Sequence, residues 1–234
     1  MSGRESTWRL SVVVPVLNDA ACIVGALRSL QPLRARGHEL IVVDGGSADG
    51  TPALASPFAD RLLAAPRGRA AQMNAGAAVA RGDALLFLHA DTRLPADADR
   101  LVREALAEPR RCWGRFDVRI DGRSPLLAVV AFCMNRRSRL SGIATGDQAI
   151  FATRPAFERA GGFPEIALME DIAFSKRMKK LSRPACLAAT ATTSGRRWER
   201  HGVLRTILLM WRLRLAYFLG APPEELARRY AKQG

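Results

Sequence analysis

An imidazole and a carboxylate stand at the end of an apolar run, and their types and spacing suit metal or phosphate chemistry. Residues Ala84 to Leu88 run without polar interruption, which predicts a strand buried on both faces of a sheet. His89 follows directly, and Asp91 comes two residues later. Because side chains two apart on an extended chain lie on the same side, we expect both to face one ligand or one metal ion. In open α/β sheets, ligands bind just past the carboxyl ends of such strands.

A second carboxylate, Asp44, ends another predicted strand, residues 39–44. Dinucleotide-binding folds place their ribose-binding acid at such a position. Those folds also need a Gly-x-Gly-x-x-Gly motif after the first strand, where this chain has Pro15-Val16-Leu17-Asn18-Asp19 and no glycine before Gly25. The sequence therefore argues against a dinucleotide oxidoreductase. It also contains no Gly-x-x-x-x-Gly-Lys-Ser/Thr phosphate loop.

The elements that must position these groups alternate between strands and helices in the first half of the chain. Apolar periodicity predicts strands at 10–15, 39–44, 61–65 and 84–88, and helices at 19–31 (ending near Pro32 and Gly37), from Gly50 or Thr51, at 68–80, and from Pro95 to about 106. This alternation predicts an α/β fold with a parallel sheet and right-handed crossovers.

The second half has a different rhythm and predicts a mixed arrangement. We expect strands at 112–120 and 148–152, and helices at 125–140, 170–181 and 203–219. We predict a single domain over residues 1–234, with a nucleotide-binding half at about 9–110, a catalytic half at about 111–200 and C-terminal helices at about 201–232.

Composition and charge set limits on the class of protein. The 234 residues carry a formal net charge of +14, and residues 176–234 alone hold 14 Lys and Arg against 3 acidic residues, a net charge of +11. Such a basic region indicates an anionic partner, although a solvated surface has the same composition. The four cysteines are far apart, which argues against a zinc site or disulfide framework and favours a cytoplasmic location. We expect no signal peptide.

Several spaced motifs together resemble one enzyme family. These are Pro-x-x-Asn-Asp after the first strand, Asp-Gly-Gly-Ser-x-Asp-Gly-Thr after the second, Gly-Arg-Ala-Ala-Gln-Met-Asn-Ala-Gly in the third helix, Phe-Leu-His-Ala-Asp-Thr, and Gly-Asp-Gln. The set resembles the family 2 glycosyltransferases, inverting enzymes of the GT-A fold that use nucleotide-sugar donors. More narrowly, it resembles a small bacterial branch described as associated with radical-SAM/selenodomain proteins. The resemblance covers roughly residues 9–230.

The resemblance implies a donor site built from the first half. It implies that Pro15 and Asn18 shape the pocket floor, that Asp44 binds a uracil edge or ribose hydroxyl, and that Arg69 contacts the donor phosphates. The remaining donor-side residues are Gly46, Ser47, Asn74, His89 and Asp91. His89-Ala90-Asp91 stands where the family has Asp-x-Asp, which holds Mn²⁺ or Mg²⁺ against the diphosphate. Asp91 is the better ligand for a hard cation, while His89 is expected to ligate the metal, bind phosphate or orient Asp91.

The resemblance also implies an acceptor side. An inverting transfer needs a base to take the acceptor hydroxyl proton, and the family's acid pair is matched by Glu170 and Asp171. We assign Asp171 as the base and Glu170 as structural or acceptor-binding; the alternative is that both are first-turn acids favoured by the helix dipole. The acceptor-side residues are Gly146, Asp147, Gln148, Arg197 and Trp198, the last with packing in the core as the alternative to stacking on a sugar.

Residues 203–219 are apolar but too short and too rich in arginine to span a membrane. We expect this helix to lie in a membrane interface and favour a lipid-linked acceptor, with core packing or a homodimer as alternatives. For the whole chain, the alternatives to sugar transfer are a nucleotidyltransferase and a non-catalytic nucleotide- or nucleic-acid-binding protein. The low aromatic content argues against specific nucleic-acid binding.

Overall fold

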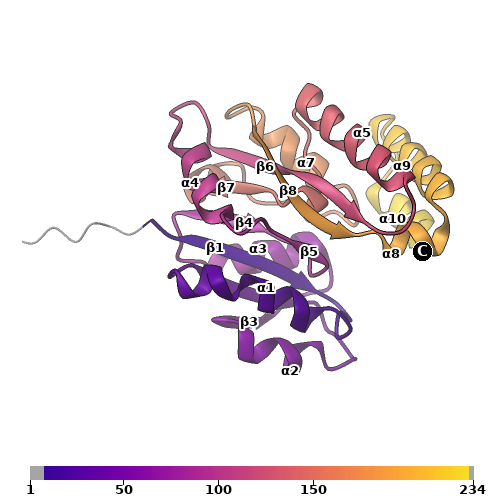
Figure 1. Ribbon diagram of the computed structural model, residues 1–234. Helices are drawn as coiled ribbons and strands as arrows, with labels where there is room; N and C mark the ends of the chain where they lie inside the picture. Colours follow the sequence, from indigo (N-terminus) through magenta and orange to yellow (C-terminus); the bar gives the residue numbers. More distant parts are fainter. Residues whose placement is uncertain (1–7, 232–234) are drawn as a thin grey trace, which may run out of the picture.

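The computed structural model describes residues 8–231, which form an α/β structure around one eight-stranded sheet (Figure 1). The strands lie in the order β3-β2-β1-β4-β7-β6-β8-β5. Their bounds are β1 Leu10–Val16, β2 Glu39–Asp44, β3 Arg61–Ala64, β4 Ala84–Phe87, β5 Thr92–Arg93, β6 Trp113–Asp121, β7 Phe151–Thr153 and β8 Ala185–Ser194.

Helices cover both faces of this sheet and one end of it (Figure 1). The α-helices are α1 Ile23–Ala35, α2 Thr51–Ala55, α3 Arg69–Val79, α4 Ala98–Ala107, α5 Leu126–Ser141, α6 Arg154–Arg159, α7 Glu170–Met178, α8 Arg196–His201, α9 Val203–Phe218 and α10 Pro223–Ala231. Two short 3₁₀ turns, η1 Ser56–Phe58 and η2 Gly146–Gln148, complete the structure.

The first half confirms the predicted parallel sheet. Strand β1 pairs in parallel with β2 and with β4, and β2 pairs in parallel with β3. Their carboxyl ends therefore meet at one edge, and the loops after β1, β2 and β4 lie there together. The second half is mixed, since β7 runs antiparallel to β4 and β6 while β6 and β8 are parallel.

Alternating side chains of the strands supply two cores on opposite faces of the sheet. On one face, Val12 and Val14 of β1 pack with Leu27 and Leu30 of α1 and with Val102 of α4. On the other face, the core combines β1 and β2 with α3, α6 and α7, and its central members are Val13, Ile41, Met73, Phe157, Phe163 and Phe174. The second core links the helix that carries Arg69 to the helix that carries Glu170 and Asp171.

Four predicted elements have bounds that were wrong by three or more residues, and one of them is α7, which ends at Met178 rather than at residue 181. Helix α1 begins at Ile23 and continues through Pro32 to Ala35, because Leu33 beyond the proline is still buried in the core. Helix α4 begins at Ala98, since Pro95 belongs to a turn in which its carbonyl accepts a hydrogen bond from Ala98 N. Strand β7 begins at Phe151 rather than at residue 148, because residues 146–148 form the turn η2.

Strand β8 was not predicted. Its sequence, Ala-Cys-Leu-Ala-Ala-Thr-Ala-Thr-Thr-Ser, has few large apolar residues, and most of its positions are half-buried. It pairs with β6 in parallel over eight residues, with one irregularity between Phe116 and Asp117. The long neighbour β6 therefore supplies the pairing that its own composition does not indicate.

Candidate functional site

The loops after β1 and β2 are tied to each other at the edge of the sheet. Asn18 N donates a hydrogen bond to Ser47 Oγ (2.9 Å), and Asn18 Oδ1 accepts one from Ala48 N (2.9 Å). The buried carboxylate of Asp44 accepts hydrogen bonds from the backbone amides of Gly46 (2.9 Å) and Ser47 (3.0 Å). Asp44, Ser47 and Asn18 thus shape the loops beside which a nucleoside would bind, and Asp44's predicted contact with the nucleoside itself stays a prediction.

A glutamine that sequence reasoning missed braces the same edge. Gln72 of α3 is buried, and its Nε2 donates to the carbonyls of Val16 (2.8 Å) and Val43 (2.9 Å), at the ends of β1 and β2. A Cβ on Gly45 would lie 3.0 Å from the Gln72 amide. Glycine at position 45 therefore leaves room for Gln72, which lies in the Gly-Arg-Ala-Ala-Gln motif and could have been singled out from it. Pro15, predicted to shape the donor pocket, is buried within β1.

Asn74 of α3 joins the two halves of the molecule. Its Nδ2 donates to Phe163 O (2.8 Å), and its Oδ1 accepts from Phe163 N (2.9 Å). Both polar atoms of the amide thus fix the loop before α7 to α3. The predicted donor-binding role of Asn74 stays a prediction.

His89 and Asp91 lie in different surroundings. Strand β4 ends at Phe87, and a turn closed by the hydrogen bond from Thr92 N to His89 O (3.0 Å) follows. The extended geometry on which we based a shared orientation is therefore absent. The His89 ring contacts Asp147, with 3.2 Å between Nδ1 and Oδ1, whereas Asp91 is exposed and its Oδ1 accepts from Thr92 and Thr193 hydroxyls at 3.4 Å.

Asp91 lines a groove of about 450 Å³ between the N-terminal part of α1 and strands β5 and β8. The residues that line it include Cys22, Gly25, Asp121, Thr193 and Arg196. The groove therefore combines the carboxylate of Asp91 with the guanidinium of Arg196, beside the loop after β1.

The acceptor-side motifs converge on one cluster. Asp171 lies in the first turn of α7 and is half-buried; its Oδ1 accepts from Ile172 N (2.7 Å) and its Oδ2 from Gly146 N (3.0 Å). The second bond joins the Gly146-Asp147-Gln148 turn to the acid pair. Since His89 contacts Asp147, the strand-end histidine, the 3₁₀ turn and the acid pair form one continuous group.

Burial and neighbouring charges shift the pKa values of this group. Burial raises the pKa of Asp171, with Asp147 adding to the rise and the amides of Gly146 and Ile172 opposing it. Burial and the charge of Asp171 also raise the pKa of Glu170. Desolvation would raise the pKa of Asp147, but the hydrogen bond and charge of His89 outweigh it, so that pKa is lowered.

Two arginines are electrostatically coupled to these acids. Against the desolvation of its guanidinium, the charges of Glu170, Asp147 and Asp171 raise the pKa of Arg69, at the start of α3. Sequence reasoning missed Arg137 of α5, whose buried Nε and Nη2 have no hydrogen-bond partner among the described residues. Desolvation lowers the pKa of Arg137, while Asp171 raises it. A signal for Arg137 was its helical spacing of seven residues from Val130 and three from Met134, both of which are buried.

Gln148 and Trp198 make contacts that account for them structurally. Gln148 is buried, accepts from Thr145 N at 3.1 Å and donates to Asn135 Oδ1 at 3.3 Å, which fixes η2 to α5. Trp198 is half-buried and packs against the apolar cluster of β6 and α5. The packing alternative for Trp198 is thus what the structure shows, and its predicted contact with a sugar stays a prediction.

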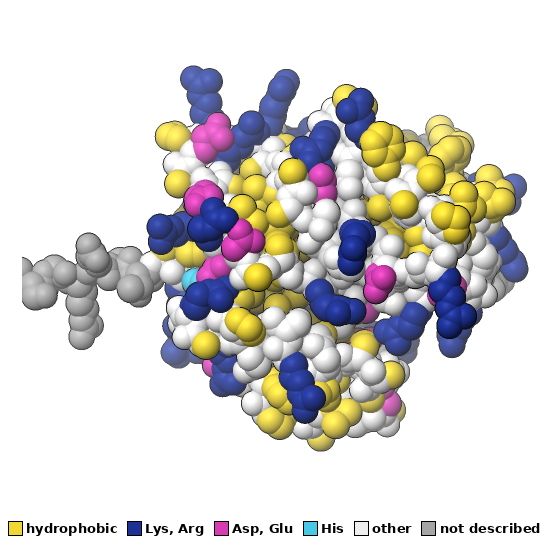
Figure 2. Space-filling model, in the orientation of Figure 1, with side chains coloured by type: hydrophobic (Ala, Val, Ile, Leu, Met, Phe, Trp, Pro, Cys, Tyr) yellow, Lys and Arg dark blue, Asp and Glu magenta, His cyan; other side chains and the backbone are white. Residues whose placement is uncertain are grey.

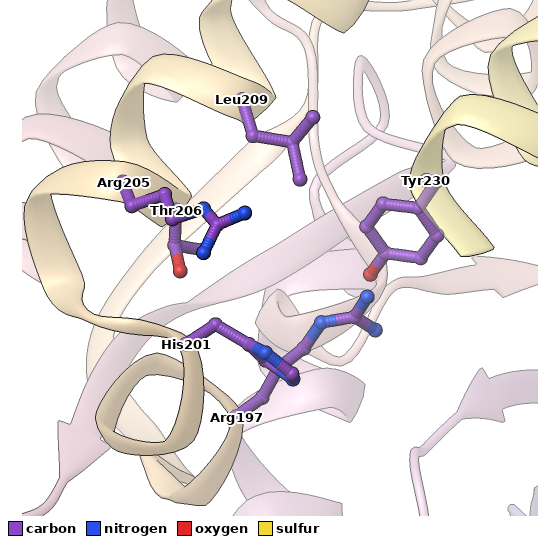
Figure 3. Close-up of a pocket in the computed structure, with 6 residues that line it drawn as sticks. All are labelled: Arg197, His201, Arg205, Thr206, Leu209 and Tyr230. Atoms are coloured by element: carbon purple, nitrogen blue, oxygen red, sulfur yellow. The ribbon is translucent and has the colours of Figure 1, made fainter. Parts of the chain in front are cut away.

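Arg197 of α8 contacts the C-terminal helix. Its guanidinium carbon lies 3.8 Å from the centre of the Tyr230 ring, and the two side chains point toward one another in Figure 3. They border a cavity of about 10 Å³, together with His201, Arg205, Thr206 and Leu209. That volume is at most enough for a single water molecule, so this cavity is not a substrate site. Burial raises the pKa of Tyr230, and Asp147 and Glu170 are among the charges that act on it.

Comparisons with known proteins identify the family of this chain. The model of the glycosyl transferase family 2 matches residues 11–151, more than half of the chain. The chain belongs to glycosyltransferase family 2. It is 39% identical over 102 residues to a Mycobacterium tuberculosis "PGL/p-HBAD biosynthesis glycosyltransferase", which covers 41% of this chain and 40% of that relative. The chain thus spans well under two thirds of the length of the curated relatives it matches.

Solved structures of GT-A glycosyltransferases share its fold. A mannosyltransferase from Pyrobaculum calidifontis in complex with GDP-Man and Mn²⁺ has a TM-score of 0.66 at 21% identity, covering 97% of this chain and 70% of that one. S. aureus TarS 1-349 in complex with UDP-GlcNAc has a TM-score of 0.65 at 17% identity, covering 80% of this chain and 58% of that one. The fold is therefore the GT-A fold, as the motifs predicted.

The residues of this family 2 chain fit a metal shared with a diphosphate. Within residues 8–231, no group of three or more His, Cys, Asp or Glu side chains is arranged to hold an ion by itself. Mg²⁺ is commonly held by one or two carboxylates together with substrate phosphates, and the exposed Asp91 can supply one. His89 fits this role less well, because a Cβ on Gly146 would lie 2.4 Å from its Nε2 and Asp147 occupies its Nδ1 side.

Proposed function

We propose that this family 2 chain transfers a sugar from a nucleoside diphosphate sugar to a hydroxyl acceptor with inversion, and we favour a uridine diphosphate donor. The observation that carries the proposal is the junction of His89, Asp147, Gly146 and Asp171 at the carboxyl edge of the parallel sheet. It puts a carboxylate with a raised pKa beside the edge where the fold binds nucleotides. The structures with UDP-GlcNAc and GDP-Man support the donor class.

In this proposal Asp171 is the general base. The acceptor oxygen attacks the anomeric carbon of the sugar, the bond to the nucleoside diphosphate breaks on the opposite face, and the acceptor proton passes to the Asp171 carboxylate. The raised pKa suits this task, because a base is most effective when its pKa lies near the working pH. The two backbone amides on Asp171 hold its carboxylate in one orientation.

The other residues bind and position. Asp44, Ser47 and Asn18 shape the nucleoside side, Arg69 lies where it can balance negative charge, and His89 orients Asp147. Asp91 would hold Mn²⁺ or Mg²⁺, which neutralises charge on the departing diphosphate when it is bound. Glu170 and Asp147, with Arg197 nearby, form the acceptor side of the proposal.

The first experiment is a thermal-stability screen with UDP, GDP and their sugars, with and without Mn²⁺. A ligand that binds only the folded state stabilises it by about 2.7 kcal/mol at a hundredfold excess over its Kd. We expect a shift with a uridine nucleotide that depends on the metal. A shift with nucleoside triphosphates and sugar phosphates, together with pyrophosphate release, would instead indicate a nucleotidyltransferase. No shift with any nucleotide at millimolar concentration would contradict the proposal.

A further inference from the structure

The outer side of α9 carries an exposed apolar stripe. Its members lie at spacings of four and three residues, which puts them on one side of the helix, and they are Leu204, Leu208, Trp211, Leu215 and Phe218. Trp211 is 67% exposed, although tryptophan is among the side chains that gain most from burial. The opposite side of the same helix is buried through Val203, Thr206 and Leu213. Helix α9 is therefore apolar on two sides, of which only one is covered.

Helix α5 extends this apolar surface. Val129, Phe132 and Leu140 are exposed on it, with Leu140 at 82%. Val203 at the start of α9 belongs to the same apolar cluster as Leu127 and Val130 of α5, so the two helices lie against each other. Figure 2 shows hydrophobic side chains gathered over this end of the molecule, where Figure 1 places α5 and α9. We call this surface the α5–α9 face.

Arginines flank the stripe on both sides. At 100° per residue, Arg205 and Arg212 lie along one edge of the stripe and Arg214 along the other. Arg205 and Arg212 are exposed, and so is Arg136 of α5, whereas the guanidinium of Arg139 is paired with Asp117. An apolar strip bordered by long cationic side chains matches a bilayer surface, since the guanidinium groups can reach anionic headgroups while the apolar side chains enter the acyl boundary.

We propose that the α5–α9 face binds the surface of an anionic lipid bilayer. Charge complementarity favours this occupant, because anionic headgroups attract the arginines that border the stripe. A second copy of the chain would bring like charges into contact, and like-charge pairs across an interface oppose association. None of the helices within residues 8–231 is long and apolar enough to cross a membrane. In this proposal, side chains of α5 and α9 make the contact with the bilayer.

The inner side of α9 connects this face to the acid pair. Leu213 of α9 packs with Met169 and Ile172, which flank Glu170 and Asp171. Binding through the outer side would thus hold the acid pair one helix away from the bilayer. It follows, resting on the proposed function, that the acceptor is itself held in the membrane.

The test uses vesicles of defined composition and the whole chain. We expect co-sedimentation with vesicles that contain phosphatidylglycerol, and at least tenfold weaker partitioning onto vesicles of phosphatidylcholine alone. The double variant Leu208→Glu/Leu215→Glu should lose at least tenfold in partitioning. The matched control Leu54→Glu/Leu62→Glu changes two exposed leucines on α2 and β3, at the other end of the sheet, and should bind as the unaltered chain does. Circular dichroism checks that both variants are folded.

A second readout does not depend on a glutamate variant. Brominated lipids should quench part of the tryptophan fluorescence of the unaltered chain, and Trp211→Phe should remove that quenching, since Trp8, Trp113 and Trp198 lie outside the stripe. Equal vesicle binding by the two double variants would overturn the proposal. So would unquenched Trp211, or a dimer in light scattering that Leu208→Glu/Leu215→Glu dissociates. Vesicle binding without any sugar transfer would overturn the proposed function but would still support membrane binding by the α5–α9 face.

Discussion

The backbone amide of Gly146 donates a 3.0 Å hydrogen bond to Asp171 Oδ2, which joins two segments 25 residues apart. On its other side, Gly146 lies so close to His89 that a Cβ would come within 2.4 Å of the ring Nε2. One glycine is therefore packed between the end of strand β4 and the first turn of α7. Any change in the position of η2 would be transmitted to the carboxylate that we propose as the base.

Asp171→Asn should stop transfer while leaving donor binding near normal. An amide cannot accept the acceptor proton, and loss of a general base typically lowers the rate by about 10²–10⁴-fold. The measurement compares kcat with the Kd of the donor from calorimetry. Glu165→Gln, at an exposed position before α7, is the control and should retain full activity. Normal turnover of Asp171→Asn would show that the base is another residue.

The rate of transfer should rise with pH through the raised pKa of the acid pair. The base must be ionised, so activity is lost as pH falls through that pKa, which lies above the ordinary value of about 3.9 for an aspartate. Because Glu170 and Asp171 interact, the observed midpoint belongs to the pair. Asp147→Asn removes a charge that raises the pKa of Asp171 and should move the midpoint to lower pH. A move to higher pH in kcat profiles would contradict this assignment.

Asp91→Ala should remove the metal dependence of donor binding. Asp91 and Asp121 are both exposed carboxylates that line the groove beside the β1 loop, and Asp91 is the one whose Oδ1 accepts a hydrogen bond from the Thr193 hydroxyl. We expect UDP titrations with and without Mn²⁺ to give equal affinities in this variant, and donor binding to weaken at least tenfold in the presence of the metal. Asp97→Ala, six residues after Asp91, removes an exposed ion pair with Arg100 and is the control. An unchanged Mn²⁺ effect in Asp91→Ala would remove Asp91 from the site.

Asp99→Asn should change stability in a pH-dependent way. Burial raises the pKa of Asp99, but hydrogen bonds from Arg36 (2.6 Å) and His38 (2.9 Å) outweigh it and lower the pKa to about 2. Because the folded-state pKa is depressed, the stabilisation is present above the unfolded-state value of about 3.9 and is lost as pH falls toward 2.

The size of this effect is about 2 kcal/mol at most, since a shift of one pKa unit is about 1.4 kcal/mol and solvent screens the half-exposed Arg36. Urea denaturation of the unaltered chain and of Asp99→Asn should show a difference in unfolding free energy that shrinks between about pH 6 and pH 3. A difference that is the same at both pH values would mean that ionisation of Asp99 does not stabilise the fold.

The first half of the fold could be predicted because its strands are buried on both faces. Strand β2 has the predicted bounds, Glu39–Asp44, since its apolar run is long and ends at a carboxylate. Strand β8 gave no such signal, because half-buried alanines and threonines suit several conformations. Its position depends on pairing with β6, and that pairing is a tertiary interaction.

The site could be predicted in its residue types and less well in its contacts. Glu170, Asp171 and Asp147 were all named. The hydrogen bond from Gly146 to Asp171 joins segments that are far apart in the sequence, and sequence separation does not indicate which segments come into contact. The expected shared orientation of His89 and Asp91 was wrong for a local reason, the turn closed by Thr92. Arg137 lies among neighbouring arginines, and its helical spacing from the buried Val130 and Met134 distinguishes it from Arg136 and Arg139.

Gly146→Ala should destabilise the chain, and removal of the His89 ring should relieve the effect. The new Cβ would lie 2.4 Å from Nε2 and 2.5 Å from Cε1 of His89, far inside van der Waals contact. Forcing a group into a packed site typically costs about 1–3 kcal/mol. In a His89→Ala background the same substitution should cost little, because the ring it meets is gone. The four unfolding free energies from urea denaturation form a double-mutant cycle in which the two changes are not additive.

The matched control for this cycle is Gly25→Ala in α1, where a Cβ would meet nothing within 4 Å. Alanine there should stabilise the chain by up to about 1 kcal/mol, because glycine is a poor helix former. The same Gly146→Ala variant should also lower the rate of transfer, since moving η2 moves the amide that holds Asp171. Additive costs in the cycle, or a Gly146→Ala variant as stable and active as the unaltered chain, would show that His89 and η2 are not in contact as the structure has them.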